Sequence, residues 1–209
     1  IVPIGTWVLE TACHEARRWQ DQYPDQNLRL SVNLSPTQVF QADMVDTVRG
    51  ALDRSGLAPG SLVLELIEDV VIKDVGAASS RLNELKVLGI RLAVDDFGTG
   101  YSSLNYLRSL PFDILKIDKS FIDDITVDPT KFAVGKLIID LAHTLGLRTV
   151  AEGVERPEQA AALRELRCHA AQGYLFARPL PAAAADELLR GWRPVAPETR
   201  SPTTVSALK

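Results

Sequence analysis

Short apolar segments alternate with longer amphipathic segments along most of the chain. The short ones are rich in Val, Ile and Leu, which predicts strands at 28–34, 61–68, 90–95, 113–118, 147–152 and 168–174. The longer ones place apolar residues at helical spacing, which predicts helices at 1–20, 36–55, 77–89, 101–110, 129–146, 156–167 and 181–192. From Arg193 onward the chain is rich in Pro, Thr and Ser and lacks periodicity. We therefore expect one domain over residues 1–192 and a disordered tail over 193–209.

Strands that alternate with helices predict a parallel sheet with right-handed crossovers. Six strands suffice for an open doubly wound sheet, whereas a closed (β/α)8 barrel needs eight strands and typically about 250 residues. Polar side chains stand at the carboxyl end of every predicted strand: Asn33, Glu65, Asp95 with Asp96, Lys116 with Asp118, Glu152, and Gln172. An open sheet uses only the two strand ends at its switch point, while a barrel brings all of them to one rim. The pattern favours the barrel, with about two β/α units before Ile1 needed to complete the ring.

Composition narrows the classes of partner. Hydrophobic residues make up 46% of the 209 residues and charged residues 24%, and the net charge of -4 gives no basic surface for a nucleic-acid polymer. Cys13 and Cys168 lack the spacing of a metal site or a disulfide framework, so we expect reduced thiols and a cytoplasmic location. No apolar stretch approaches the roughly 20 residues of a membrane span, although a longer parent protein could be tethered to a membrane.

Asp95 and Asp96 place two like charges side by side at the end of a buried segment. In a partly buried rim the two carboxylates repel each other, and a divalent cation relieves that repulsion. Asp, Glu and Asn oxygens favour a hard ion such as Mg²⁺ or Mn²⁺ over zinc. Several carboxylates can hold two such ions, and a two-metal site suits in-line attack on a phosphodiester. The alternative interpretation is that the pair only ends a strand and caps the next helix.

Lys116 lies at the end of an apolar strand, where a buried lysine needs an anionic partner. Beside metal ions it could orient a water molecule or take part in its deprotonation. The alternative is a salt bridge to Asp118 or Asp96 that holds the rim together. The glycines of the FGTGYSS segment could present backbone N–H groups to a phosphate, but that signal is weak. We expect structural or surface roles for the three histidines, which lack ligand spacing: His14, His143 and His169.

Six motifs together resemble the EAL-domain family of cyclic di-GMP phosphodiesterases. In family order they are SVNLS (31–35), LELIE (64–68), DDFGTGYSSL (95–104), LKIDKSF (115–121), AEGVE (151–155) and QGYLFARPLP (172–181). The resemblance implies a TIM-like barrel, dependence on Mg²⁺ or Mn²⁺, and hydrolysis of cyclic di-GMP to linear pGpG in bacterial signalling. It also implies a homodimer formed through the region after DDFGTG. A sensory or diguanylate cyclase domain attached in the parent protein is a further expectation.

Carried over motif by motif, the resemblance implies a role for each matched polar residue. It implies five metal ligands: Asn33, Glu65, Asp95, Asp96 and Glu152. Lys116 resembles the residue that acts on the nucleophilic water, and Gln172 resembles part of its network. Asp118 and Glu155 resemble positions that contact the ligand or support those that do. Glu68 resembles the residue that holds the DDFGTGYSS loop in its working conformation.

Two departures from the family pattern leave a second function open. The Glu-Ala-Leu segment that names the family, with its metal-binding Glu, is not in this chain, and Ile67 stands where the family usually has Thr. The alternative to an enzyme is therefore a receptor that binds cyclic di-GMP without cleaving it. A different barrel hydrolase or isomerase with a lysine base fits the motif order poorly. For these 209 residues alone we expect weak or no turnover, because a metal ligand and two strands are missing.

Overall fold

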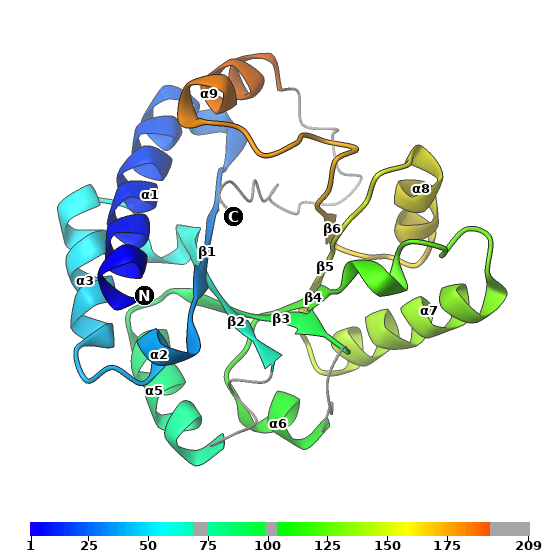
Figure 1. Ribbon diagram of the computed structural model, residues 1–209, viewed down its shortest axis with the longest axis horizontal. Coiled ribbons are helices and arrows are strands. Elements are labelled where there is room, and N and C mark those ends of the chain that lie inside the picture. Colours follow the sequence, from blue (N-terminus) through cyan, green and yellow to red (C-terminus); the bar gives the residue numbers. More distant parts are fainter. Residues whose placement is uncertain (69–74, 99–103, 193–209) are drawn as a thin grey trace. The chain divides into compact units, whose positions relative to one another are not determined.

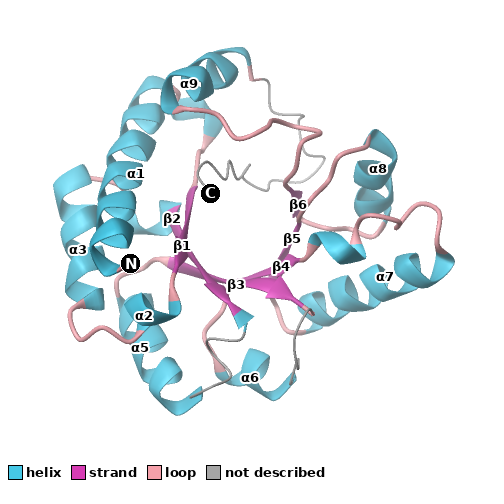
Figure 2. Ribbon diagram, viewed as in Figure 1, coloured by secondary structure: helices cyan, strands magenta, loops and turns pink. Residues whose placement is uncertain are grey.

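The computed structural model describes residues 1–68, 75–98 and 104–192, and it confirms the alternation of strands and helices. Its sheet holds six strands in chain order: β1 (Leu30–Leu34), β2 (Leu62–Ile67), β3 (Arg91–Phe97), β4 (Ile114–Ile117), β5 (Arg148–Ala151) and β6 (Ala170–Ala171) (Figure 2). The helices among the described residues are α1 (Val2–Gln22), α2 (Pro36–Val39), α3 (Met44–Ser55), α5 (Val75–Val87), α6 (Leu104–Ser109), α7 (Pro129–Thr144), α8 (Pro157–Glu165) and α9 (Ala182–Gly191). The tail predicted over 193–209 and most of the FGTGYSS segment lie outside the described residues.

The chain divides into two compact units. Of the described residues, the first unit comprises 1–65, 80–91 and 179–192, and the second comprises 66–68, 75–79, 92–98 and 104–178. In the first unit α1 packs beside α3 and against β1 (Figure 1). The apolar face of α1 is buried at helical spacing, through Leu9, Ala12, Cys13, Ala16 and Trp19. Burial, reinforced by the nearby Glu10 carboxylate, raises the pKa of the Cys13 thiol to about 12.

The helix predicted over 36–55 is two helices, so that prediction was wrong. Val39 at the end of α2 and Met44 at the start of α3 are both buried, at 1% and 3% exposure. In one continuous helix these two residues would lie about 140° apart, on different faces. The break between them lets both side chains reach the core. Ser35 closes the first turn of α2 with Gln38, whose backbone N–H bonds to the Ser35 hydroxyl.

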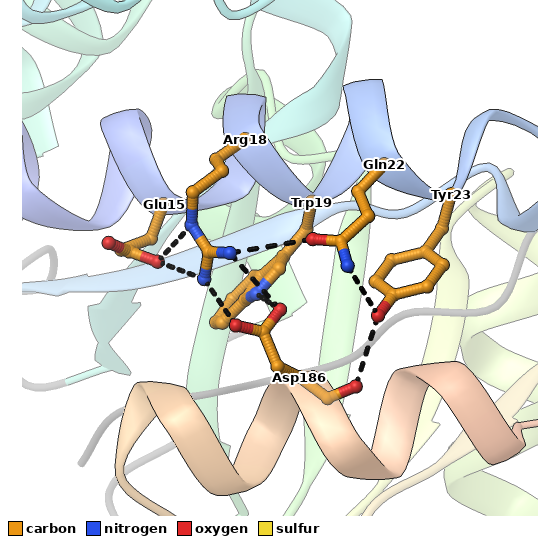
Figure 3. Close-up of polar contacts among 6 residues, drawn as sticks. All are labelled: Glu15, Arg18, Trp19, Gln22, Tyr23 and Asp186. Atoms are coloured by element: carbon orange, nitrogen blue, oxygen red, sulfur yellow. Dashed lines mark hydrogen bonds and ion pairs between the residues drawn. The ribbon is translucent and has the colours of Figure 1, made fainter.

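The last helix, α9, is fastened to α1 by polar contacts around Asp186. Figure 3 shows the Asp186 carboxylate accepting hydrogen bonds from the Arg18 guanidinium and from Trp19 Nε1, each at 2.8 Å at its shortest. The Tyr23 hydroxyl donates to the Asp186 backbone oxygen at 3.1 Å. Beneath these contacts lies a small apolar cluster of Trp19, Leu28, Ala185 and Leu189. Both polar contacts to Asp186 and apolar packing therefore hold α9 against the α1 region.

Replacing Asp186 with Asn should lower the melting temperature by roughly 1–3 °C at neutral pH, because the charge opposite Arg18 is lost. Hydrogen bonding from Arg18 holds the pKa of Asp186 below its ordinary value of 3.8. The contribution of the carboxylate is therefore present above that pH and is lost as the pH falls through the lowered pKa. Melts of both proteins from about pH 7 to about pH 2 should converge at the acid end. A constant difference across that range would contradict this assignment.

Candidate active site

Three neighbouring strands of the second unit carry the candidate residues. β3, β4 and β5 pair in parallel, and the register sets Val94 beside Leu115 and Lys116 beside Val150. Asp95 therefore follows Val94 at the level of Lys116. Side chains alternate along a strand, so Glu152, two residues beyond Val150, points to the same face as Lys116. The carboxyl ends of the three strands thus bring an amine and two carboxylates together.

Lys116 lies between two carboxylates in the interior. Its ammonium nitrogen is 2.8 Å from Oδ1 of Asp95 and 2.7 Å from Oε1 of Glu152. Lys116 and Asp95 are each 2% exposed and Glu152 is 7% exposed, so water screens these charges little. Lys116 does form salt bridges, and the partners among these contacts are Asp95 and Glu152. The predicted pairing of Lys116 with Asp118 or Asp96 stays a prediction.

Asp96 reaches the same cluster because the strand is irregular. Adjacent residues of a regular strand point to opposite faces, so Asp95 and Asp96 would be separated. The register between β3 and β4 shifts between Val94 and Phe97, and Asp96 has a left-handed backbone with φ of 54°. Asp is one of the few residues that tolerates this conformation. The backbone N–H of Asp96 donates to Oδ1 of Asp95 at 3.1 Å, which fixes the turn.

The resulting cluster fits a hard divalent cation. One carboxylate oxygen each from Asp95, Asp96 and Glu152 lies within 4.8 Å of the other two. These three carboxylates outnumber the single ammonium of Lys116, so the cluster has an excess of negative charge that a cation would neutralise. An all-oxygen donor set suits an ion such as Mg²⁺, Mn²⁺ or Ca²⁺. The alternative that Asp95 and Asp96 only end a strand does not explain why both join Glu152.

Glu68 contacts the loop that begins after β3. Its Oε2 accepts a hydrogen bond from the backbone N–H of Gly98 at 3.1 Å, and its side chain is 2% exposed. A Cβ on Gly98 would come within 2.8 Å of the Phe121 ring, so the backbone there packs closely. The structure thus brings Glu68 to the start of the predicted loop. Residues 99–103 of that loop, and with them the beginning of the region predicted to form a dimer, are outside the described part.

The other predicted site residues of the second unit lie around the same strand ends. Asp118 follows β4 and caps a 3-10 helix (Lys119–Phe121) by accepting from the Ser120 N–H at 3.0 Å. Glu155 is exposed and forms an ion pair with Lys119 at 2.9 Å. The backbone of Gln172 extends the pairing beyond β6, since its N–H donates to the Ala151 oxygen and its oxygen accepts from the Val154 N–H. These contacts stabilise the segments after the strands. The roles of Asp118, Glu155 and Gln172 in binding or catalysis stay predictions.

Asn33 and Glu65 belong to the first unit. Asn33 is an exposed residue of β1, and Glu65 is a 4% exposed residue of β2. The roles of Asn33 and Glu65 as metal ligands stay predictions. Ile67 at the end of β2 is 42% exposed.

His143 and His169 contact each other within the protein. His169 bonds through Nδ1 to Thr149, and its ring meets that of His143 edge to face at 5.0 Å. Burial, followed by the positive charge of Arg148, lowers the pKa of His169. Both cysteines are free thiols. Among the described helices, none is long and apolar enough to cross a membrane.

Comparison with known proteins gives the family. A sequence model of the EAL domain matches residues 1–179. The chain belongs to the EAL-domain family. It is 46% identical over 199 residues to the cyclic di-GMP phosphodiesterase NbdA of Pseudomonas aeruginosa, a match that covers 95% of this chain and 25% of NbdA. The chain thus spans about a quarter of the length of the curated relatives it matches.

Solved EAL structures share the fold. The PaMucR phosphodiesterase in complex with c-di-GMP superposes with a TM-score of 0.83 at 43% identity, covering 88% of this chain and 74% of that one. Klebsiella pneumoniae BlrP1 in a manganese and cyclic di-GMP complex gives 0.72 at 32% identity, covering 83% and 44%. These matches confirm the predicted TIM-like (β/α) barrel class, with six of its strands in the part of this EAL domain that the structure describes.

Two features of the site were missed by sequence reasoning. One is the irregularity of β3 that turns Asp96 toward Asp95, since nothing in VDDF distinguishes it from a regular strand end. The other is a pair of residues, Lys119 and Gln159, that connect the segments following β4 and β5. Lys119 lies inside the quoted LKIDKSF motif, which assigned it no role. Gln159 lies in an unremarkable helix, where only its position in the first turn could have signalled a bonding role.

Proposed function

We propose that this EAL domain is the catalytic part of a phosphodiesterase that hydrolyses cyclic di-GMP to linear pGpG. The observation that carries the proposal is the buried Asp95–Lys116–Glu152 cluster, joined by Asp96, at the ends of three parallel strands. Support comes from the named activities of NbdA and PaMucR and from the cyclic di-GMP bound in the PaMucR and BlrP1 structures.

The site is proposed to work with two divalent cations, Mg²⁺ or Mn²⁺. Asp95, Asp96 and Glu152 would hold them, together with Asn33 and Glu65. When bound, such ions stabilise charge on the attacking and leaving oxygens of a phosphodiester. The manganese in the BlrP1 complex supports this choice.

Other residues of the chain would orient the attacking water, contact the nucleotide and fix the loop after β3. Lys116 donates an N–H to the attacking water and orients it toward phosphorus, while Asp95 and Glu152 fix the ammonium in place. Gln172 belongs to the same water network. Asp118 and Glu155 contact the nucleotide or support residues that do, and Glu68 fixes the loop through Gly98. The water oxygen bonds to phosphorus and loses a proton to solvent, while the bond from phosphorus to the leaving 3′ oxygen breaks and that oxygen takes up a proton.

Nucleotide chromatography tests the proposal. Cyclic di-GMP is incubated with Mg²⁺ or Mn²⁺ and either this chain or the chain extended into the upstream sequence of its parent protein. We expect pGpG from the extended chain, weak or no product from the 209 residues, and none with EDTA. Tight binding of cyclic di-GMP by the extended chain without product would instead establish the receptor.

We also propose that the domain works as a homodimer within a larger protein that carries a sensory or cyclase domain. The size of the relatives supports the second part, because the matched region is about a quarter of their length. Light scattering on the extended chain measures the first part. A dimer at micromolar concentration is expected, and a monomer that hydrolyses cyclic di-GMP at full rate would contradict it.

A further inference from the structure

Two loops of the second unit, those that follow β4 and β5, are joined by side chains with no assigned role. The first loop begins at Asp118, just after Lys116, and the second begins at Glu152. The Lys119 ammonium lies 2.7 Å from an Asp123 carboxylate oxygen within its own loop and 2.9 Å from a Glu155 carboxylate oxygen in the other. One cation thus bridges the segment that carries Lys116 and the segment that carries Glu152.

The stem of Lys119 also covers the backbone next to Glu152. Gly153 has a left-handed backbone with φ of 66°. A Cβ at Gly153 would come within 2.3 Å of Cγ of Lys119 and within 2.7 Å of its Cβ. The aliphatic part of Lys119 therefore lies directly on Gly153. This contact limits the path that the backbone can take immediately after Glu152.

Gln159, at the start of α8, makes the second connection. Its Oε1 accepts from the backbone N–H groups of Glu155 and Arg156, each at 2.9 Å. Its Nε2 donates to the backbone oxygens of Ile122 and Asp123 at 3.1 and 3.2 Å. The Gln159 side chain is 2% exposed, so water does not compete for these four contacts. One buried amide therefore holds both loops at a fixed separation.

We propose that Lys119 and Gln159 are positioning residues that hold Glu152 in the geometry required for metal binding. This inference rests on the proposed metal site. Lys116 belongs to strand β4, whereas Glu152 is followed directly by Gly153. The backbone position of Glu152, and with it the direction of its carboxylate, therefore depends on how the two loops are joined. Residues that orient metal ligands typically change metal affinity or activity by about 10–100-fold when they are replaced.

Four variants separate positioning from general stability. Lys119→Met keeps the stem over Gly153 and removes the charge, while Lys119→Arg restores a cation. Gln159→Leu removes all four hydrogen bonds of a buried amide. Lys136→Met is the matched control, because Lys136 also forms an exposed ion pair with an acidic residue four positions away, on α7, which contributes no predicted site residue.

Isothermal titration with Mn²⁺ and melting curves are measured on each protein, followed by kcat and KM for cyclic di-GMP on the extended chain. Lys119→Met should weaken Mn²⁺ binding about 10-fold and lower kcat with little change in melting temperature, since exposed ion pairs add little stability. Lys119→Arg should recover most of the affinity, and Lys136→Met should match the unaltered protein. Gln159→Leu should weaken Mn²⁺ binding further and also lower the melting temperature.

Unchanged Mn²⁺ affinity in Lys119→Met overturns the inference for Lys119, even if Gln159→Leu does not fold. Equal losses in Lys119→Met and Lys136→Met also overturn it, because the effect would then belong to surface charge in general. If the unaltered chain binds Mn²⁺ but does not cleave cyclic di-GMP, the proposed reaction fails and the Mn²⁺ affinities still decide the positioning role. Absence of Mn²⁺ binding by the unaltered chain overturns the metal site and the positioning role together.

Discussion

Replacing Lys116 with Met should lower the free energy of unfolding by about 3–5 kcal/mol in the absence of divalent cations. The ammonium lies within 2.8 Å of carboxylates on Asp95 and Glu152 and is 2% exposed. Methionine fills much of the same volume, so the loss comes from the carboxylates left facing one another without a cation. Chemical denaturation with EDTA present measures this effect.

Addition of Mn²⁺ should return part of the lost stability to Lys116→Met, because the cation supplies the missing positive charge. Turnover should nevertheless fall by at least about 100-fold, since the group proposed to orient the water is gone. Lys136→Met, which removes an exposed lysine from α7, should stay within about 0.5 kcal/mol of the unaltered protein. Lys116→Met that is as stable as the unaltered protein in EDTA would contradict the buried pairing.

Replacing Asp95 with Asn should weaken Mn²⁺ binding by at least about 100-fold, more than replacement of a residue that only orients a ligand. Asp95 connects Lys116 to Asp96, because its Oδ1 accepts hydrogen bonds from both the Lys116 ammonium and the backbone N–H of Asp96. The amide keeps the shape but carries no charge, so Lys116 also loses one counterion. Isothermal titration with Mn²⁺ measures the affinity.

In the extended chain, Asp95→Asn should lower kcat by about 10²–10⁴-fold, since the proposed metal ligand and the fixed position of Lys116 are lost together. Asp140→Asn is the matched control, because Asp140 also pairs with a lysine but lies exposed on α7. It should bind Mn²⁺ and turn over as the unaltered protein does. Equal Mn²⁺ affinity in Asp95→Asn and Asp140→Asn would exclude Asp95 as a ligand.

The strands and the charged residues at their ends could be predicted from the sequence, because burial on a parallel sheet leaves a clear apolar pattern. Lys116 and Glu152 illustrate this: Lys116 is the last residue but one of β4 and Glu152 directly follows β5, so a shared rim follows from topology. The break between α2 and α3 could not be predicted. Its cause is the simultaneous burial of Val39 and Met44, which depends on tertiary contacts.

The fine geometry of the site also depends on contacts between distant residues. The left-handed backbone of Asp96 arises where the register between β3 and β4 shifts, and the sequence VDDF alone does not predict this shift. The role of Gln159 depends on backbone groups of two loops, Ile122–Asp123 and Glu155–Arg156, that lie more than thirty positions apart in the sequence. Local patterns therefore located the charged residues of the candidate site, and tertiary packing determined how their side chains are oriented.

The most direct measurement is anomalous diffraction from crystals of the extended chain grown with Mn²⁺ and cyclic di-GMP. The account predicts Mn²⁺ peaks coordinated by carboxylate oxygens of Asp95, Asp96 and Glu152, with the Lys116 ammonium beside them. Metal bound elsewhere, with those three carboxylates contacting only protein and water while the nucleotide is in place, would contradict it.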